Sequence, residues 1–234
     1  MAVVGAEQAG KALSTVATKL AIADILSWEG QQVLEDQAGR MRKLGNVPAW
    51  GMEVDRHRPV FFNNSVDKNG AAIRISIEGA RVAVEQGDEN VCPVRNLDAA
   101  IVIADAQSEV IARWHIDKAN FEEGGEEEKQ AQPGPLFHLQ FGGHVAGRRD
   151  LDLPIKEPRW CHPPLEIALL CEVVAANFFE QAWSDSVRDD ESWCNAIQLF
   201  QRLCWEHYLR KKLECITVSR STALGLMWAD RWPD

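Results

Sequence analysis

Polar and apolar residues alternate through the middle of the chain. Residues 73–77 carry isoleucine at every second position with polar side chains between them, and residues 82–84 repeat the pattern with valine. Residues 99–116 form two such arms around a polar turn, and residues 135–141 are the last alternating stretch. A period of two is typical of a strand with one buried face. These segments predict an antiparallel β-meander within residues 46–150.

The N-terminal part of the chain has the spacing of a helix instead. Between residues 7 and 44, leucine and methionine recur at multiples of seven positions, which predicts a long N-terminal helix. Gly30 interrupts this helix, and Gly45 followed by Pro48 is a stop signal.

The last third of the chain begins with prolines and continues as helix. Four prolines between residues 154 and 164 keep this linker extended, because the residue before a proline avoids the helical region. Pro164 suits the first turn of a helix, so we expect a buried helix over residues 164–183. A second helix is expected over residues 191–213, and its basic last turn complements the helix dipole.

Together these patterns predict one α+β domain over residues 1–234. It comprises an N-terminal helical segment (1–45), a central antiparallel sheet (46–150) and a proline-rich linker with a helical segment (151–234). Because each expected strand has one apolar face, we expect the C-terminal helices to pack on one face of the sheet.

Composition narrows the choice of partner. The formal net charge is −10, which argues against nucleic acid as a general partner, because phosphate binding depends on Lys and Arg. The sequence contains no run of about 18 apolar residues, so we expect no membrane partner. Nine tryptophans stand beside a single tyrosine, and tryptophan is enriched in protein interfaces. We therefore expect another protein subunit as the partner, and the sequence leaves the oligomeric state open.

The six cysteines are interpreted as reduced thiols. The first residues lack the basic and apolar regions of a secretory signal, and three of the cysteines lie in segments expected to be helical. Disulfides are rare in reducing compartments. We therefore expect a cytoplasmic protein without a disulfide framework.

The first candidate site is Cys161 with His162, just ahead of an expected helix. The positive end of a helix dipole stabilises a thiolate, so this pair has the residue types of a nucleophilic site. The alternative is that His162 fixes the turn while Cys161 packs in the core.

A second candidate is a ligand-binding group made of His138, Gly142, Gly143 and His144. Glycines that follow a strand let the backbone approach a ligand closely. The alternative is that His138 follows ordinary strand alternation and that the glycines only turn the chain.

Cys204 and His207 share one face of an expected helix and could hold Zn²⁺ with Cys194 or Cys215. The paired short spacings that mark a zinc site are absent from the sequence. The sequence therefore assigns no metal ion and no other cofactor. No spacing singles out a carboxylate pair, and the possible general bases are simply carboxylates among others: Asp105, Asp117 and Glu166.

The order of the expected elements carries a resemblance to a known fold. A helix and a meander ending at residues 136–141 are followed by an extended stretch with Pro154 and Pro158, which leads to His162-Pro163. This order resembles the RWD and ubiquitin-conjugating E2-like fold.

That resemblance implies a catalytic cysteine. E2 enzymes place a thioester-forming cysteine a short distance after a His-Pro-Asn signature, and Cys171 follows His162 by nine positions. Pro164 stands in the place of the asparagine, so the amide that stabilises the oxyanion in the family is missing here. A shared fold does not by itself confer a shared function.

These observations favour a non-catalytic interaction or accessory subunit of an intracellular, bacterial multi-protein system, for example a defence system. One alternative is a cysteine-dependent enzyme, such as an E2-like conjugating protein, that uses Cys161 or Cys171. A second alternative is a small-ligand or metal-binding module around His138 and His144.

Overall fold

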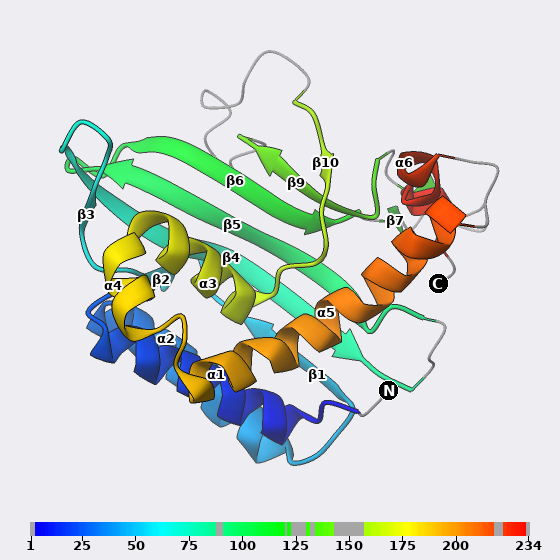
Figure 1. Ribbon diagram of the computed structural model, residues 1–234, viewed down its shortest axis with the longest axis horizontal. Helices are drawn as coiled ribbons and strands as arrows, with labels where there is room; N and C mark the ends of the chain where they lie inside the picture. The colour runs from blue at the N-terminus through cyan, green and yellow to red at the C-terminus, as the bar shows by residue number, and fades with distance from the viewer. Residues whose placement is uncertain are drawn as a thin grey trace.

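The computed structural model describes residues 3–87, 91–119, 121–122, 130–131, 134–142, 157–217 and 222–232. The chain forms an antiparallel eight-stranded sheet, with helices from both ends of the chain gathered on one side of it (Figure 1). The strand order is β1-β4-β5-β6-β9-β10, and β2 and β3 also pair with β4. The predicted α+β class is confirmed.

The elements have the following bounds. The strands are β1 (Ala49–Glu53), β2 (Val60–Phe61), β3 (Ser65–Val66), β4 (Ala72–Glu85), β5 (Val94–Asp105), β6 (Val110–Lys118), β7 (Phe121–Glu122), β8 (Gln130–Ala131), β9 (Phe137–Phe141) and β10 (Trp160–Cys161). The helices are α1 (Ala6–Ile22), α2 (Trp28–Leu44), α3 (Ile167–Phe178), α4 (Glu180–Ser186), α5 (Glu191–Thr217), α6 (Ala223–Leu226) and the 3₁₀ turn η2 (Ala229–Arg231).

The centre of the sheet is the long pair β4·β5. Ile75 lies opposite Ile103 and Ile77 lies opposite Ile101, and all four belong to the apolar core. Each fully buried isoleucine stabilises the fold by about 1.5–3 kcal/mol. Ser76, between the two isoleucines of β4, points to the other face, as strand alternation requires. One face of the sheet is therefore fixed as the core face.

A bulge divides β4 without ending it. The register with β5 shifts between Glu78 and Arg81, and Gly79 has a φ of +57°. Glycine adopts this left-handed conformation without the clash that a Cβ would cause. The alternating segments predicted at residues 73–77 and 82–84 are therefore two halves of a single strand.

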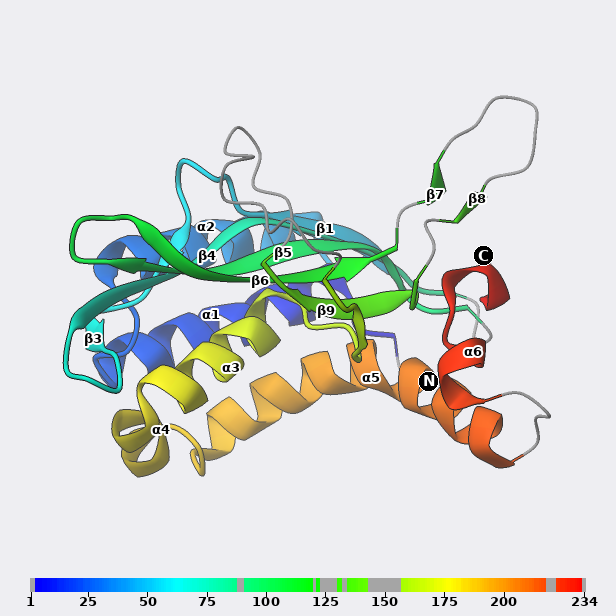
Figure 2. The same cartoon turned by 90° about the horizontal axis from the view of Figure 1, so that it is seen from above.

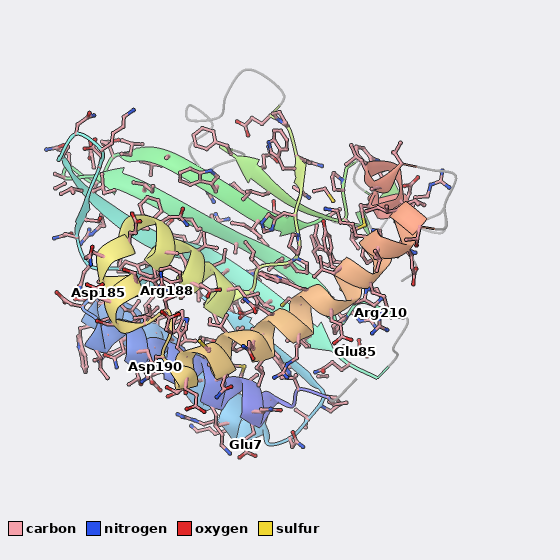
Figure 3. All side chains as sticks on the ribbon, in the orientation of Figure 1. Glu7, Glu85, Asp185, Arg188, Asp190 and Arg210 are labelled. Carbon is pink, nitrogen blue, oxygen red and sulfur yellow. The ribbon has the colours of Figure 1, made fainter. Side chains whose placement is uncertain are left out.

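The described helices cover one face of the sheet and one of its edges. Figure 2 shows α1, α3 and α5 on one side of it, while α2 lies along the β1 edge. Leu13, Val16 and Leu20 of α1 are fully buried. Lys19 joins α1 to the start of α5 through an ion pair with Asp190, in which Nζ lies 2.6 Å from Oδ2. Asp190 is labelled in Figure 3. The prediction that the C-terminal helices pack on one face is confirmed.

The N-terminal helical segment breaks at a different place from the one predicted. The break lies at residues 23–27 and not at Gly30, because Asp24 has a φ of +57° and Ser27 caps α2 by accepting a hydrogen bond from Gly30 N. Gly30 lies inside α2, where a Cβ would collide with the carbonyl oxygen of Phe61. The glycine therefore allows close helix–strand packing and does not interrupt the helix.

The helix predicted from Pro164 begins three residues later, at Ile167. Glu166 is its N-cap, and its carboxylate accepts hydrogen bonds from the backbone N–H groups of Ala168 (3.0 Å) and Leu169 (2.9 Å). These bonds satisfy donors that the first helical turn leaves open. None of the described helices combines the length and the apolar composition needed to cross a bilayer.

The buried cap makes stability depend on pH. Burial raises the pKa of Glu166 from 4.5 to about 7, although the two backbone N–H groups oppose the shift. A raised folded-state pKa gives a stability contribution that is complete below pH 4.5 and is lost as the pH rises through 7. The loss is roughly 3 kcal/mol, since each unit of pKa is worth about 1.4 kcal/mol.

We predict that Glu166→Gln removes this part of the pH dependence. Gln keeps an acceptor for the helix N-terminus but cannot ionise, so the free energy of unfolding should fall less between pH 4.5 and 8 than in the original protein. Urea unfolding at several pH values measures the slope. Glu191→Gln, at the exposed first residue of α5, is the control. An unchanged slope in Glu166→Gln would contradict the assignment.

Candidate functional site

One row of polar side chains crosses the face of the sheet opposite the helices. The ladder pairs Glu53 with Arg81, Arg81 with Asp98, Asp98 with Asp117, and Asp117 with His138. Directly opposite residues of antiparallel strands point to the same side. Five strands therefore each bring one polar side chain into this row.

Asp98, His115 and Asp117 form a cluster of metal-ligating type. One ligand atom from each residue lies within 4.8 Å of the ligand atoms of the other two. Asp98 and Asp117 are direct neighbours on β5 and β6, and His115 precedes Asp117 by two positions on the same face of β6. His115 Nδ1 lies 4.0 Å from Asp117 Oδ2. We call these three residues the Asp-His-Asp cluster.

His138 borders the cluster from the next strand, β9. Its side chain is 2 % exposed, and its Nε2 lies 3.8 Å from Asp117 Oδ2. The other ring nitrogen, Nδ1, lies 3.2 Å from the carbonyl oxygen of Pro135. The contact with Pro135 fixes the ring beside Asp117, and the distance of 3.8 Å to Asp117 is longer than a hydrogen bond. Burial, and then the charge of Arg159, lower the pKa of His138 to about 4, so the ring is neutral at pH 7.

The environment of Asp117 disfavours its ionisation. Burial raises the pKa of Asp117 to about 7, and the neighbouring charge of Asp98 adds to this shift. Asp117 Oδ1 is buried and has no hydrogen-bond partner among the residues that the structure describes. A cation between the carboxylates would relieve their repulsion and give that oxygen a partner.

The donor set indicates which ions suit the cluster. Two carboxylates and one imidazole are ligands of Zn²⁺, Mn²⁺ and Fe²⁺ rather than of soft ions. Three protein ligands leave coordination positions open for water or another ligand, as catalytic metal sites do and closed structural sites do not.

Cys161 and His162 do not face each other. Cys161 Sγ lies 3.0 Å from the hydroxyl of Tyr208 on α5, so the thiol contacts the helical side of the sheet. The imidazole Nδ1 of His162 lies 2.7 Å from the carbonyl oxygen of Pro163. The His162 ring is thus engaged with a neighbouring carbonyl oxygen, and the thiol with a tyrosine hydroxyl.

The other cysteine and histidine candidates on helices lie inside the core. Cys171 is fully buried in α3, and burial followed by the charge of Glu166 raises the pKa of its thiol. Cys204 and His207 are buried in α5, where the His207 ring packs 5.7 Å from the ring of Trp232. These side chains are enclosed by protein atoms, which suits packing.

Of the predicted ligand-binding group, His138 lies beside the Asp-His-Asp cluster. Gly142 has a φ of +79°, and its backbone N–H donates to the carbonyl oxygen of Arg113 (2.7 Å). Gly142 therefore turns the chain at the end of β9. Gly143 and His144 lie outside the described residues.

Among the general-base candidates, only Asp117 lies in the cluster. Asp105 caps the β5–β6 turn by accepting from the N–H groups of Gln107 and Glu109, and Glu166 caps α3. Asp98 and His115 were not among the predicted site residues. The hairpin predicted over residues 99–116 could have revealed Asp98. If its strand pairing is extended by one position, residue 98 lies opposite residue 117.

No family model matches the chain, and the searches of curated proteins and of solved structures give no match. The resemblance to the RWD and E2-like fold therefore stays a prediction. Functional assignment depends on the geometry of the chain's own residues.

Proposed function

We propose that the protein is a binding module that holds a divalent metal ion on the helix-free face of its sheet, through Asp98, His115 and Asp117. The observation that supports this proposal is the mutual approach of one ligand atom from each residue within 4.8 Å. The three residues come from two rigid, fully paired strands, which fixes their positions better than loops would. His138 lies beside Asp117 and outside the proposed ligand set.

We predict that the full chain, dialysed against EDTA, binds one equivalent of Zn²⁺ or Mn²⁺ in isothermal titration calorimetry. Asp117→Asn should weaken that affinity at least tenfold, because even the partners of metal ligands contribute about 10–100-fold. Asn has the shape of Asp, so the fold should persist, as circular dichroism can verify.

The matched control for this titration is Glu85→Gln, which neutralises an exposed carboxylate at the far end of β4 (Figure 3). It should bind the metal as the original protein does. Equal affinities in Asp117→Asn and Glu85→Gln, or no binding to the original protein, would refute the metal site.

A second candidate function is that of an accessory subunit which binds another protein. The specific observation is an apolar stripe on the C-terminal half of α5, where Leu209 is 52 %, Leu213 is 62 % and Ile216 is 68 % exposed. Residues spaced by four and three positions share one helix face. Figure 2 shows this half of α5 running past the ends of the strands, and Figure 3 labels Arg210 on it.

The stripe's surroundings indicate the chemistry of its partner. Arg210, Lys211 and Lys212 lie beside the apolar side chains, within a chain of net charge −10. A complementary surface would be apolar with an acidic rim. All six cysteines are unpaired, which suits a reducing compartment, so we also propose the cytoplasm as the location.

We predict that Leu209→Ser combined with Leu213→Ser abolishes association with such a partner. Affinity purification of the tagged full chain, followed by mass spectrometry, compares this double variant with Val110→Ser/Ile111→Ser, which removes two exposed apolar side chains elsewhere. A protein retained by the control and lost from the stripe variant supports the accessory role. Identical sets of co-purifying proteins would eliminate it.

A further inference from the structure

A second exposed apolar surface lies where α1 ends and α2 begins. Ile22, the last residue of α1, is 77 % exposed, and Trp28, the first residue of α2, is 68 % exposed. A turn of five residues joins the two helices, so both side chains belong to one corner of the molecule. We call residues 22–29 the α1–α2 corner. Exposed large apolar side chains that are rimmed by polar groups commonly mark a surface for another protein.

The charged residues of the α1–α2 corner are both acidic. They are Asp24 and Glu29, and both are exposed. Hydrogen bonds from its own backbone N–H and from Ser27 lower the pKa of Glu29. Arg74 acts weakly on Glu29, and its guanidinium is already stacked on Phe61 (4.9 Å). The corner therefore presents two negative charges beside its apolar side chains.

The α5 stripe has charges of the opposite sign. The basic residues within it are Arg210, Lys211 and Lys212. Arg210 pairs with Glu206 one turn earlier on the helix (2.7 Å). Among the described residues, Lys211 and Lys212 have no carboxylate oxygen within 4.0 Å of Nζ. Two stripes packed on each other would bring these lysines together, and like charges across an interface cost affinity. The stripe therefore favours an acidic partner surface.

The two surfaces lie at opposite ends of the long axis of the molecule. Figures 1 and 2 both show the turn between α1 and α2 at one end and the C-terminal half of α5 at the other. Copies that carry complementary surfaces at opposite ends associate head to tail. Every such assembly keeps one free surface at each end, so further copies can add to it.

We infer that the α5 stripe of one copy binds the α1–α2 corner of a second copy of this chain. The apolar residues of the stripe would pack on Ile22 and Trp28, and its lysines would lie near Asp24 and Glu29. The inference rests on the second proposed function, because it takes the stripe as a binding surface, and it identifies the partner as the chain itself. Both surfaces are small, so the assembly should be reversible and should weaken as salt screens the charges.

Sedimentation velocity of the full chain, over a wide range of protein concentrations, tests this inference. We expect the average mass to rise with concentration beyond that of a dimer, and to fall at high salt. Trp28→Ser removes the largest apolar side chain of the corner, and Leu209→Ser with Leu213→Ser removes most of the stripe. Either change should weaken self-association roughly tenfold or more, as expected for apolar side chains at the centre of an interface.

A mixture of these two variants distinguishes head-to-tail association from a symmetric pairing. Each variant lacks one surface, but the mixture still contains one intact stripe and one intact corner on different chains. We expect the mixture to form heterodimers and nothing larger. Leu44→Ser is the control, because it removes an exposed apolar side chain at the opposite end of α2. This control should associate as the original protein does.

Three results would each overturn the inference: an original chain that stays monomeric, a mass that levels off at a dimer, and a variant mixture that stays monomeric. Circular dichroism verifies that the variants remain folded, which is expected because the changed side chains are exposed. A different protein that co-purifies through the stripe, while the chain itself stays monomeric, would support the accessory role and refute only self-association. The metal titration is independent of both outcomes.

Discussion

The packing of one face of β4·β5 against α1, α3 and α5 is the constraint on which the rest of the structure depends. Every second side chain of these strands belongs to the apolar core, as the facing pairs Ile75–Ile103 and Ile77–Ile101 show. A shift of one residue would expose the whole apolar set, so the register is strongly specified. The same register places Asp98, Asp117 and His138 in one row on the opposite face.

The helix-free face contains groups that are costly without a ligand. Asp117 Oδ1 and Arg113 Nε are buried without hydrogen-bond partners in the described part of the chain, and Asp98 disfavours the ionisation of Asp117. Natural proteins satisfy nearly all buried polar atoms, and exceptions concentrate at functional sites. The unpartnered oxygen of Asp117, in a residue that lies beside Asp98 and His115, therefore favours a bound cation at this cluster.

Periodicity predicted the sheet and the helices because burial of one face leaves a direct trace in the sequence. Periodicity missed the end of α1 at Ile22, because the break depends on the φ of Asp24. It also placed the start of α3 at Pro164, because a hydrophobic pattern does not show that Glu166 caps the helix. His138 was identified from its position in an alternating stretch that ends at two glycines. Asp98 and His115 were not, because a site shared between strands depends on pairing across the sheet.

The two proposed functions use opposite sides of the molecule. The apolar stripe lies on α5, which packs on the core face, whereas the Asp-His-Asp cluster lies on the other face (Figures 1 and 2). A partner bound to α5 would therefore leave the cluster open to its ligand. The half of α5 that carries the stripe runs past the ends of the strands, whereas the cluster lies on β5 and β6 within the sheet. The two proposals are therefore compatible with each other, because a partner on α5 and a metal ion on the sheet would occupy different surfaces.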